Sequence, residues 1–526
     1  MRRVTPRRGA ARDAGPTPAV PAAGPVTGGS RPVLAAVLVS WCALAWGIAA
    51  KDGRYGAWAM AAIGVGVTAA TCATWWARPH PVPHPVPHPV PHPVPHPGPR
   101  PLGADGWGGQ RLAWALVALT VGIGPLVRHP RYYASGTPAT VADILAACAG
   151  LLAAATIALH LGGPRRAPDG GAQAPESEAV VPGGGRGASG GRPRWRPVGP
   201  GRDSTALFWT VLMMACAAGV ATIRAAPTPR IDVFHLLQVS AVGLVHGADL
   251  YRQQWAPDRA SYGVDGLFDV YPYLPWTSVL LAPARLLLGD VRYGLLAALA
   301  VAAICARRLG TTAAGAVGML PLLVVILPES MYALQQSWTE PLLIACLAGM
   351  VLAVRHGHLR LAVVAFALAL ASKQHVALLV PLAAAWPAFG VRRTAVSAGT
   401  ALLLVAPWLL AGPGDFVDDA VVTNLRYKVL GHSLSVPGWA SHFGVTLGFG
   451  PALVVLVAAY ALAWRARGDA SGFCLGGALV LLGASLMNKQ TFFNHYTLPM
   501  GLLVLTAVLL ATPMPTPTRA TPRGRR

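Results

Sequence analysis

Residues 205–226 read TALFWTVLMMACAAGVATIRAA, and residues 227–238 continue as PTPRIDVFHLLQ. The first stretch is apolar over a length that can cross the hydrocarbon core of a bilayer as an α-helix, which takes about 20 residues. Asp232 follows a few residues after its end. We therefore predict a transmembrane helix that holds this carboxylate at the membrane surface.

Apolar runs of this kind recur along the whole chain. Of its 526 residues, 54% are hydrophobic and only 12% are charged, whereas an average soluble domain carries roughly twice that charged fraction. This composition excludes a soluble enzyme and predicts an all-α, polytopic membrane protein with about fourteen transmembrane helices. The predicted spans are 33–50, 55–77, 112–127, 139–161, 205–226, 292–306, 311–327, 340–354, 359–372, 376–390, 394–411, 450–464, 471–487 and 497–512.

The basic residues indicate how these spans are oriented. Lys and Arg number 42 against 20 Asp and Glu, and the Arg-rich stretches lie between and after the apolar runs. The positive-inside rule then places both termini in the cytoplasm, in a multi-pass protein of the cell membrane. If the apolar segment 275–289 were a full span, the later Arg-rich connections would lie outside the cytoplasm. We therefore predict that this segment, which contains two prolines and Arg285, is an interfacial or half-inserted helix. Because this topology accounts for the net charge of +22, we expect membrane lipids and no nucleic acid as partners.

Low-complexity stretches divide the chain. Residues 79–99 read PHPVPHPVPHPVPHPVPHPGP, which favours polyproline II or disorder. A spacer is the preferred interpretation over a metal site, because a four-residue period winds the histidines around a three-residue helix. The predicted parts are a disordered basic N-terminus (1–32), a four-helix membrane module (33–161) containing this spacer, a disordered cytoplasmic linker (162–204), a ten-helix module (205–512) and a basic C-terminal tail (513–526).

Three segments of the second module, 227–275, 412–449 and 488–496, are predicted to face away from the cytoplasm and are rich in polar and aromatic residues. Asp232 lies in the first of them. A partly shielded carboxylate at the mouth of a helical bundle is suited to act as a general base on a hydroxyl. From position alone, however, a solvated loop acid or the N-cap of the next helix is the preferred interpretation.

A resemblance to a known family changes that preference. After Asp232 the chain carries GADLY at 247–251, YPYLP at 271–275 and GDVR at 289–292. In this order and spacing the region from about 205 to 500 resembles the GT-C superfamily of membrane glycosyltransferases, and within it glycosyltransferase family 87. The familiar G-x-D-P-Y and Y-P-P sequences are GADLY and YPY here, and the first 200 residues lie outside the resemblance.

The resemblance implies a GT-C-like module that transfers a sugar, with mannose as the first candidate, from a polyprenyl-phosphate donor to a lipid or glycan acceptor outside the cytoplasm. Asp232 would deprotonate the acceptor hydroxyl. One carboxylate suffices for a single inverting displacement, whereas a glycosidase needs a second one. The leaving lipid phosphate departs as an anion and therefore needs positive partners.

Candidate substrate-binding residues lie in the outward segments and at the predicted ends of helices. Lys373, Arg426, Lys428 and Lys489 are candidate phosphate partners, with contact to lipid headgroups as the alternative. His495 and Tyr496 resemble an H-Y ending found in the family; the alternative is an interfacial aromatic pair. Asp249 and Tyr251 are assigned mainly to shaping the loop, with sugar contact as the second choice.

A further outward cluster lies in PESMYALQQSWTEP at 328–341. Glu340 precedes a proline at the expected start of a helix, so helix capping is its preferred role. Trp338 could stack on a sugar, but an interface anchor is preferred. Asp265 and Asp269 could form a metal pair, yet their surroundings fit an ordinary loop, and we predict neither a metal nor a cofactor.

Two other functions stay open at this point. A transporter or flippase for a lipid-linked saccharide would show broken helices and polar groups near the middle of the bilayer. A non-catalytic membrane scaffold would keep the loops without activity. Neither a P-loop nor the GxGxxG, HExxH or GxSxG motifs appear in a suitable context, so cytoplasmic nucleotide chemistry has no support.

Overall fold

The computed structural model describes residues 30–49, 55–77, 106–127, 131–162, 200–253, 270–310 and 315–512. Over these ranges the secondary structure is helical and no β-strand occurs, as expected from the sequence. The predicted N-terminus up to residue 29, the spacer at 79–99, nearly all of the linker, the C-terminal tail and the pair Asp265 and Asp269 lie outside the described residues.

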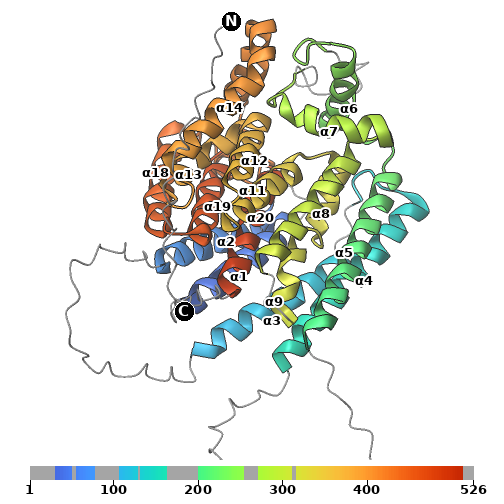
Figure 1. Ribbon diagram of the computed structural model, residues 1–526, viewed down its shortest axis with the longest axis vertical. Helices are drawn as coiled ribbons and strands as arrows, with labels where there is room; N and C mark the ends of the chain where they lie inside the picture. The colour runs from blue at the N-terminus through green and yellow to red at the C-terminus, as the bar shows by residue number, and fades with distance from the viewer. Residues whose placement is uncertain are drawn as a thin grey trace, which may run out of the picture.

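Figure 1 shows the helices in chain order, from blue at the N-terminus to red at the C-terminus. They are α1 (Ser30–Ala49), α2 (Ala57–Trp76), α3 (Gly106–Val127), α4 (Gly136–Gly162), α5 (Pro200–Ala225), α6 (Asp232–Val245), α7 (Trp276–Leu288), α8 (Arg292–Leu309), α9 (Gly315–Met319), η3 (Leu320–Val324), α10 (Pro328–Gln336), α11 (Glu340–Arg355), α12 (Leu359–Ser372), η4 (Gln374–Leu379), α13 (Val380–Ala385), α14 (Gly390–Ala411), α15 (Pro413–Val417), η5 (Asp418–Val422), α16 (Thr423–Arg426), α17 (Val436–Ser441), α18 (Phe449–Ala466), α19 (Ala470–Leu486) and α20 (Asn494–Ala511).

Within the described ranges, nine helical segments are long and apolar enough to cross a membrane, or ten if the bent pair α7–α8 forms one span. This number indicates a polytopic helical membrane protein. The segments are Arg31–Ala49, Ala57–Trp76, Gly109–Val127, Gly136–Leu161, Thr205–Ala225, Gly315–Gln336, Gly390–Ala411, Phe449–Ala466 and Asn494–Ala511.

Of the five remaining predicted spans, 292–306 forms α8 in the bent pair, and the other four correspond to shorter helices. The runs at 340–354, 359–372 and 471–487 form α11, α12 and α19, which have 16, 14 and 17 residues. The run at 376–390 begins in the 3₁₀ turn η4, and its helix α13 ends at Ala385. A straight helix rises only 1.5 Å per residue, so these elements are shorter than a typical span.

The segment expected to be interfacial is a separate helix, α7. It meets α8 at an angle of 115°. Gly289 ends α7 with φ 82°, a left-handed conformation that glycine adopts without the steric cost of a Cβ atom. Arg285 donates a hydrogen bond from Nη1 to the carbonyl of Gly289 and stabilises this turn.

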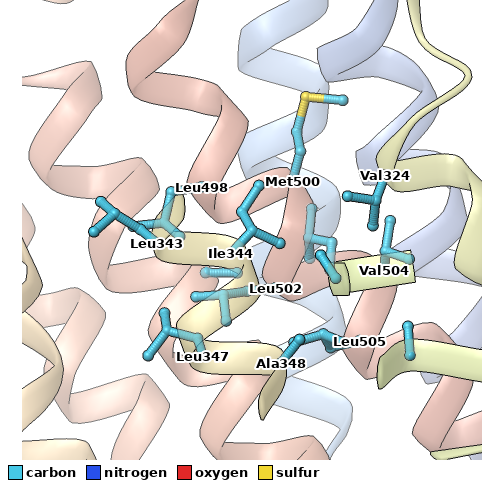
Figure 2. Close-up of a cluster of buried hydrophobic side chains, with 14 of the residues drawn as sticks. Val324, Leu343, Ile344, Leu347, Ala348, Leu498, Met500, Leu502, Val504 and Leu505 are labelled. Atoms are coloured by element: carbon cyan, nitrogen blue, oxygen red, sulfur yellow. The ribbon is translucent and has the colours of Figure 1, made fainter. Parts of the chain in front are cut away.

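Helix α20 lies in the interior of the bundle, with apolar residues buried along its length. Lipid is as apolar as leucine, so packing in a membrane depends on close contact between helices. Gly501 provides such a contact, because a Cβ atom there would lie 2.8 Å from the side chain of Ile344 on α11. Figure 2 shows the resulting cluster, which includes Val324, Leu343, Ile344, Leu347, Ala348, Leu498, Met500, Leu502, Val504 and Leu505.

The N-terminal helices share this core with the second module. Helix α1 packs against α2, α3 and α20, helix α2 packs against α18 and α19, and α4 packs against α5. Buried residues from α1 to α4 belong to the same hydrophobic cluster as those of α8, α11 and α20. The two predicted modules are therefore joined by extensive packing across the sequence boundary at the linker.

Candidate functional site

Asp232 is the first residue of α6 and is half-buried. The N-cap of this helix is Ile231, so Asp232 is not the N-cap considered from the sequence. Its Oδ1 accepts a hydrogen bond of 2.8 Å from the N–H of Val233. Burial raises the pKa of the Asp232 carboxyl group, and this hydrogen bond offsets the rise only in part. A carboxylate in this state is a stronger base than a solvated aspartate.

Helix α6 is tied to the turn between α7 and α8. Gln238 donates a hydrogen bond of 2.8 Å to Asp290, and Asp290 pairs with the buried Arg292 at 2.6 Å. Arg292 also donates to the carbonyl of Ala226 and lies 4.7 Å from the centre of the Phe234 ring. The sequence GDVR at 289–292 therefore fixes both ends of the chain segment that carries Asp232.

The YPY sequence at 271–273 joins three distant parts of the chain. The N–H of Tyr271 donates to Asp419 at 2.9 Å, and Gln374 donates to the carbonyls of Pro272 and Ala420. The N–H of Leu274 and the hydroxyl of Thr277 both donate to the carbonyl of Ser372. These bonds bring the loop after α6 against the end of α12 and against η5.

Tyr273 links Asp232 to a buried ion pair. The Nζ of Lys373 lies 2.5 Å from Oε1 of Glu340 and 5.1 Å from the centre of the Tyr273 ring. Burial raises the pKa of the Tyr273 phenol, and the negative charges of Glu340 and then Asp232 raise it further. Asp232, Tyr273 and the Lys373–Glu340 pair thus lie within electrostatic reach of one another.

The other three predicted cations form an exposed group beside this site. Lys489 donates from Nζ to the carbonyl of Leu425 at 3.1 Å, and Gln490 donates to the carbonyl of Lys428 at 2.9 Å. These bonds place Lys489 against the segment that contains Arg426 and Lys428. Burial raises the pKa of Tyr427 to about 12, and Asp232 is the charge that contributes most to this rise. Asn424, two residues before Arg426, donates from Nδ2 to the carbonyl of Pro272 at 3.5 Å, so the cationic segment lies against the YPY loop.

His495 and Tyr496 occupy the first turn of α20, where they differ in role. Tyr496 is fully buried and donates its hydroxyl to the carbonyl of Leu434 at 2.6 Å, so it holds the 434 segment in place. His495 is half-buried and accepts a hydrogen bond at Nδ1 from the N–H of Phe492. Of the two side chains, His495 is the one with exposed surface for a ligand.

Asp249 and Tyr251 shape the loop after α6, which was their preferred assignment. Asp249 accepts the N–H of Tyr251 at 3.0 Å. Tyr251 is buried and donates its hydroxyl to the carbonyl of Tyr273 at 3.0 Å. Arg252 pairs with Asp415 at 2.5 Å and connects the loop to α15.

The sequence does not predict two features of the site, the partner of Glu340 and the shielded carboxyl group of Asp419. Glu340 lies at a helix start as expected, but its carboxylate binds Lys373 and Asn494 instead of capping. The sequence contains no signal for this pairing, because Lys373 is 33 residues away and separated by two helices. Burial also raises the pKa of Asp419 to about 6, and the sequence gives no sign that this carboxyl group is shielded.

Chemically, the site combines the half-buried carboxylate of Asp232 with exposed cationic residues on the segments 425–428 and 489–490, which contact each other. In the part of the chain that the structure describes, no group of three or more His, Cys, Asp or Glu residues could hold a metal ion. Comparison of the chain with protein-family models, with curated proteins and with solved structures finds no match.

Proposed function

We propose that this protein is a membrane glycosyltransferase that moves a hexose from a polyprenyl-phosphate donor to a hydroxyl acceptor on the non-cytoplasmic side. Mannose is the first candidate for the sugar. The observation that carries the proposal is the half-buried carboxylate of Asp232, whose pKa is raised by burial and whose charge acts on Tyr427, the residue between Arg426 and Lys428. Asn424 anchors this segment to the carbonyl of Pro272 at 3.5 Å. Base and anion partners in one place are what such a transfer requires.

In the proposed reaction, the ionised Asp232 accepts the proton of the acceptor hydroxyl. The hydroxyl oxygen then forms a bond to the anomeric carbon as the bond from that carbon to the phosphate oxygen breaks. The polyprenyl phosphate leaves as an anion, and the anomeric configuration is inverted. Arg426, Lys428 and Lys489 stabilise the charge on the departing phosphate, with Arg suited to bidentate contact.

The alternative function is a flippase or transporter for a lipid-linked saccharide. One observation favours it: the apolar stretch Gly315–Gln336 is broken into α9, η3 and α10, and discontinuous helices are common in transporters. Arg426 lies at the end of α16, and Lys428 and Lys489 lie in connecting segments; all three are exposed, which favours surface chemistry.

The experiment that tests the proposal uses membranes containing the protein and polyprenyl phosphates carrying radiolabelled mannose, glucose or galactose. We expect label to appear in a new lipid or glycan, with the anomeric configuration opposite to that of the donor. If the intact labelled donor instead crosses the membrane of sealed vesicles and no new labelled product forms, the protein is a transporter and the transferase proposal is wrong.

A further inference from the structure

Unpartnered buried polar atoms gather at one place in this protein. Among the described residues, eight buried side-chain nitrogen or oxygen atoms lack a hydrogen-bond partner, and five of them belong to the junction between α10 and α11 or to the first residue of α20. They are Gln336 Nε2, Ser337 Oγ, Thr339 Oγ1, Glu340 Oε2 and Asn494 Oδ1. Buried polar groups without partners destabilise a fold, so a concentration of them marks a place where a polar ligand or ordered water completes the hydrogen bonds.

The backbone of the junction is also unusual. Ser337 ends α10 with φ 61°, and it is the non-glycine residue with a positive φ in the described chain. This conformation is costly for a residue with a Cβ atom and persists where the surroundings impose it. This conformation turns the chain between α10 and α11. Four of the five unpartnered atoms belong to the residues of this turn, 336–340. Asn494 joins them, because its Nδ2 donates to Glu340 Oε1 at 3.3 Å.

The charge of the cluster limits the ligand to an uncharged group. Lys373 already neutralises Glu340 through Oε1 at 2.5 Å, so a second cation is not required. Two of the free atoms, Glu340 Oε2 and Asn494 Oδ1, are acceptors and disfavour an anion. Gln336 Nε2 is a donor, while the hydroxyls of Ser337 and Thr339 can act either way. A mixture of fixed donors and acceptors matches a group with several hydroxyls, each of which donates and accepts.

The cluster lies near the Tyr273 ring, because Lys373, which pairs with Glu340, lies 5.1 Å from the centre of that ring. The negative charges of Glu340 and Asp232 both raise the pKa of the Tyr273 phenol, so the candidate base lies near the same side chain. Trp338 is half-buried in the same turn, where its Nε1 donates to Gln336 Oε1 at 3.1 Å. An aromatic ring next to hydroxyl-binding groups is suited to contact the apolar face of a sugar.

We propose that this cluster, residues 336–340 with Asn494, is the subsite that recognises the hexose ring of the donor. The proposal rests on the proposed function for the identity of the ligand. In it, Glu340 Oε2 and Asn494 Oδ1 accept hydrogen bonds from ring hydroxyls, and Gln336 and Thr339 donate to others.

The test measures donor binding rather than transfer. Purified full-length protein is titrated with mannosyl polyprenyl phosphate and with the same polyprenyl phosphate lacking the sugar. We expect the wild-type protein to bind the glycosylated lipid more tightly. Thr339→Val, which removes the hydroxyl without changing the shape, should reduce this preference by about tenfold and leave binding of the bare lipid unchanged.

Matched controls separate recognition from folding. Thr506→Val removes another buried threonine hydroxyl, one that already bonds to the carbonyl of Leu502, and should keep the full preference. Thr339→Ser retains the hydroxyl and should keep it too. If Thr339→Val does not fold, Gln336→Met provides the same measurement at a second free atom.

The outcomes distinguish this proposal from the function on which it rests. A sugar preference that depends on Thr339, without any labelled product in the transfer assay, would support the subsite and overturn the transferase. Sugar transfer together with an unchanged sugar preference in Thr339→Val and Gln336→Met would overturn the subsite. Equal binding of the two lipids by the wild-type protein would overturn it too, because water alone would then satisfy the five unpartnered atoms.

Discussion

At the scale of single residues, the site depends on what burial does to charge. Asp232 is poorly solvated, and this raises its pKa and makes the ionised form a better proton acceptor. Lys373 and Glu340 are both deeply buried, and each keeps its charge compensated by the other at 2.5 Å. Removing one partner of such a pair is costly because the other charge stays buried.

The first prediction concerns pH. A raised pKa means that Asp232 takes up a proton at a higher pH than a solvated aspartate does. Transfer should therefore fall as the pH decreases through this raised pKa, whereas the contribution of Asp232 to stability should be lost as the pH increases through it. The measurement is kcat/KM against pH, and an acid limb at the ordinary aspartate value would contradict the prediction.

The second prediction concerns the ion pair. Glu340→Gln leaves the Lys373 ammonium group buried without its counter-charge and should lower the free energy of unfolding by about 3–5 kcal/mol. The double variant Glu340→Gln with Lys373→Met removes both charges and should recover most of the loss. Thermal unfolding in detergent checks this, and a double variant no more stable than the single one would argue against charge burial as the cause.

At the scale of elements, the sequence predicts well where apolar runs are long and poorly where function interrupts them. The runs at 205–226 and 394–411 became α5 and α14. The run at 376–390 instead starts in a 3₁₀ turn, whose first residue, Gln374, bonds through its side chain to the carbonyls of Pro272 and Ala420. The pattern of apolar residues predicts which segments are buried, but it does not predict polar contacts between distant residues. The pairing of Lys373 with Glu340 therefore could not be predicted from the sequence either.

The third prediction concerns the position of α6. Gln238→Leu keeps the size of the side chain but removes the bonds to Asp290 and to the N–H of Val291. Because small displacements of a catalytic group are expensive, kcat should fall roughly tenfold to a hundredfold while the KM for the donor stays unchanged. A rise in KM with constant kcat would show that Gln238 acts on substrate binding instead of on the alignment of Asp232.

At the scale of the whole molecule, several connecting segments that are far apart in the sequence contact one another at the same end of the bundle. The connection before α2 contacts residues 432–442. The N–H of Tyr55 donates to the carbonyl of His432, and the rings of Tyr55 and His442 stack with their centres 4.4 Å apart. The connection before α4 meets the segment ahead of Asp232 through Tyr133, whose hydroxyl donates to the carbonyl of Arg230. All of these segments are predicted to lie outside the cytoplasm.

The fourth prediction tests this sidedness. Lys428 and Arg467 are both exposed, on segments predicted to lie on opposite sides of the membrane. In a background with Cys148 replaced by Ser, Lys428→Cys should react with a membrane-impermeant thiol reagent in intact cells, and Arg467→Cys should react only after permeabilisation. The reverse pattern would place the candidate site in the cytoplasm.

The most direct test of the account is sugar transfer by Asp232→Asn, with Asp418→Asn as the matched control at an exposed acid on η5. Both variants should fold and insert normally, and Asp232→Asn should be more stable than the wild type at neutral pH because it no longer buries a charge. We predict that Asp232→Asn loses transfer from the labelled lipid donor while Asp418→Asn retains it. Unchanged transfer by Asp232→Asn would contradict the central claim.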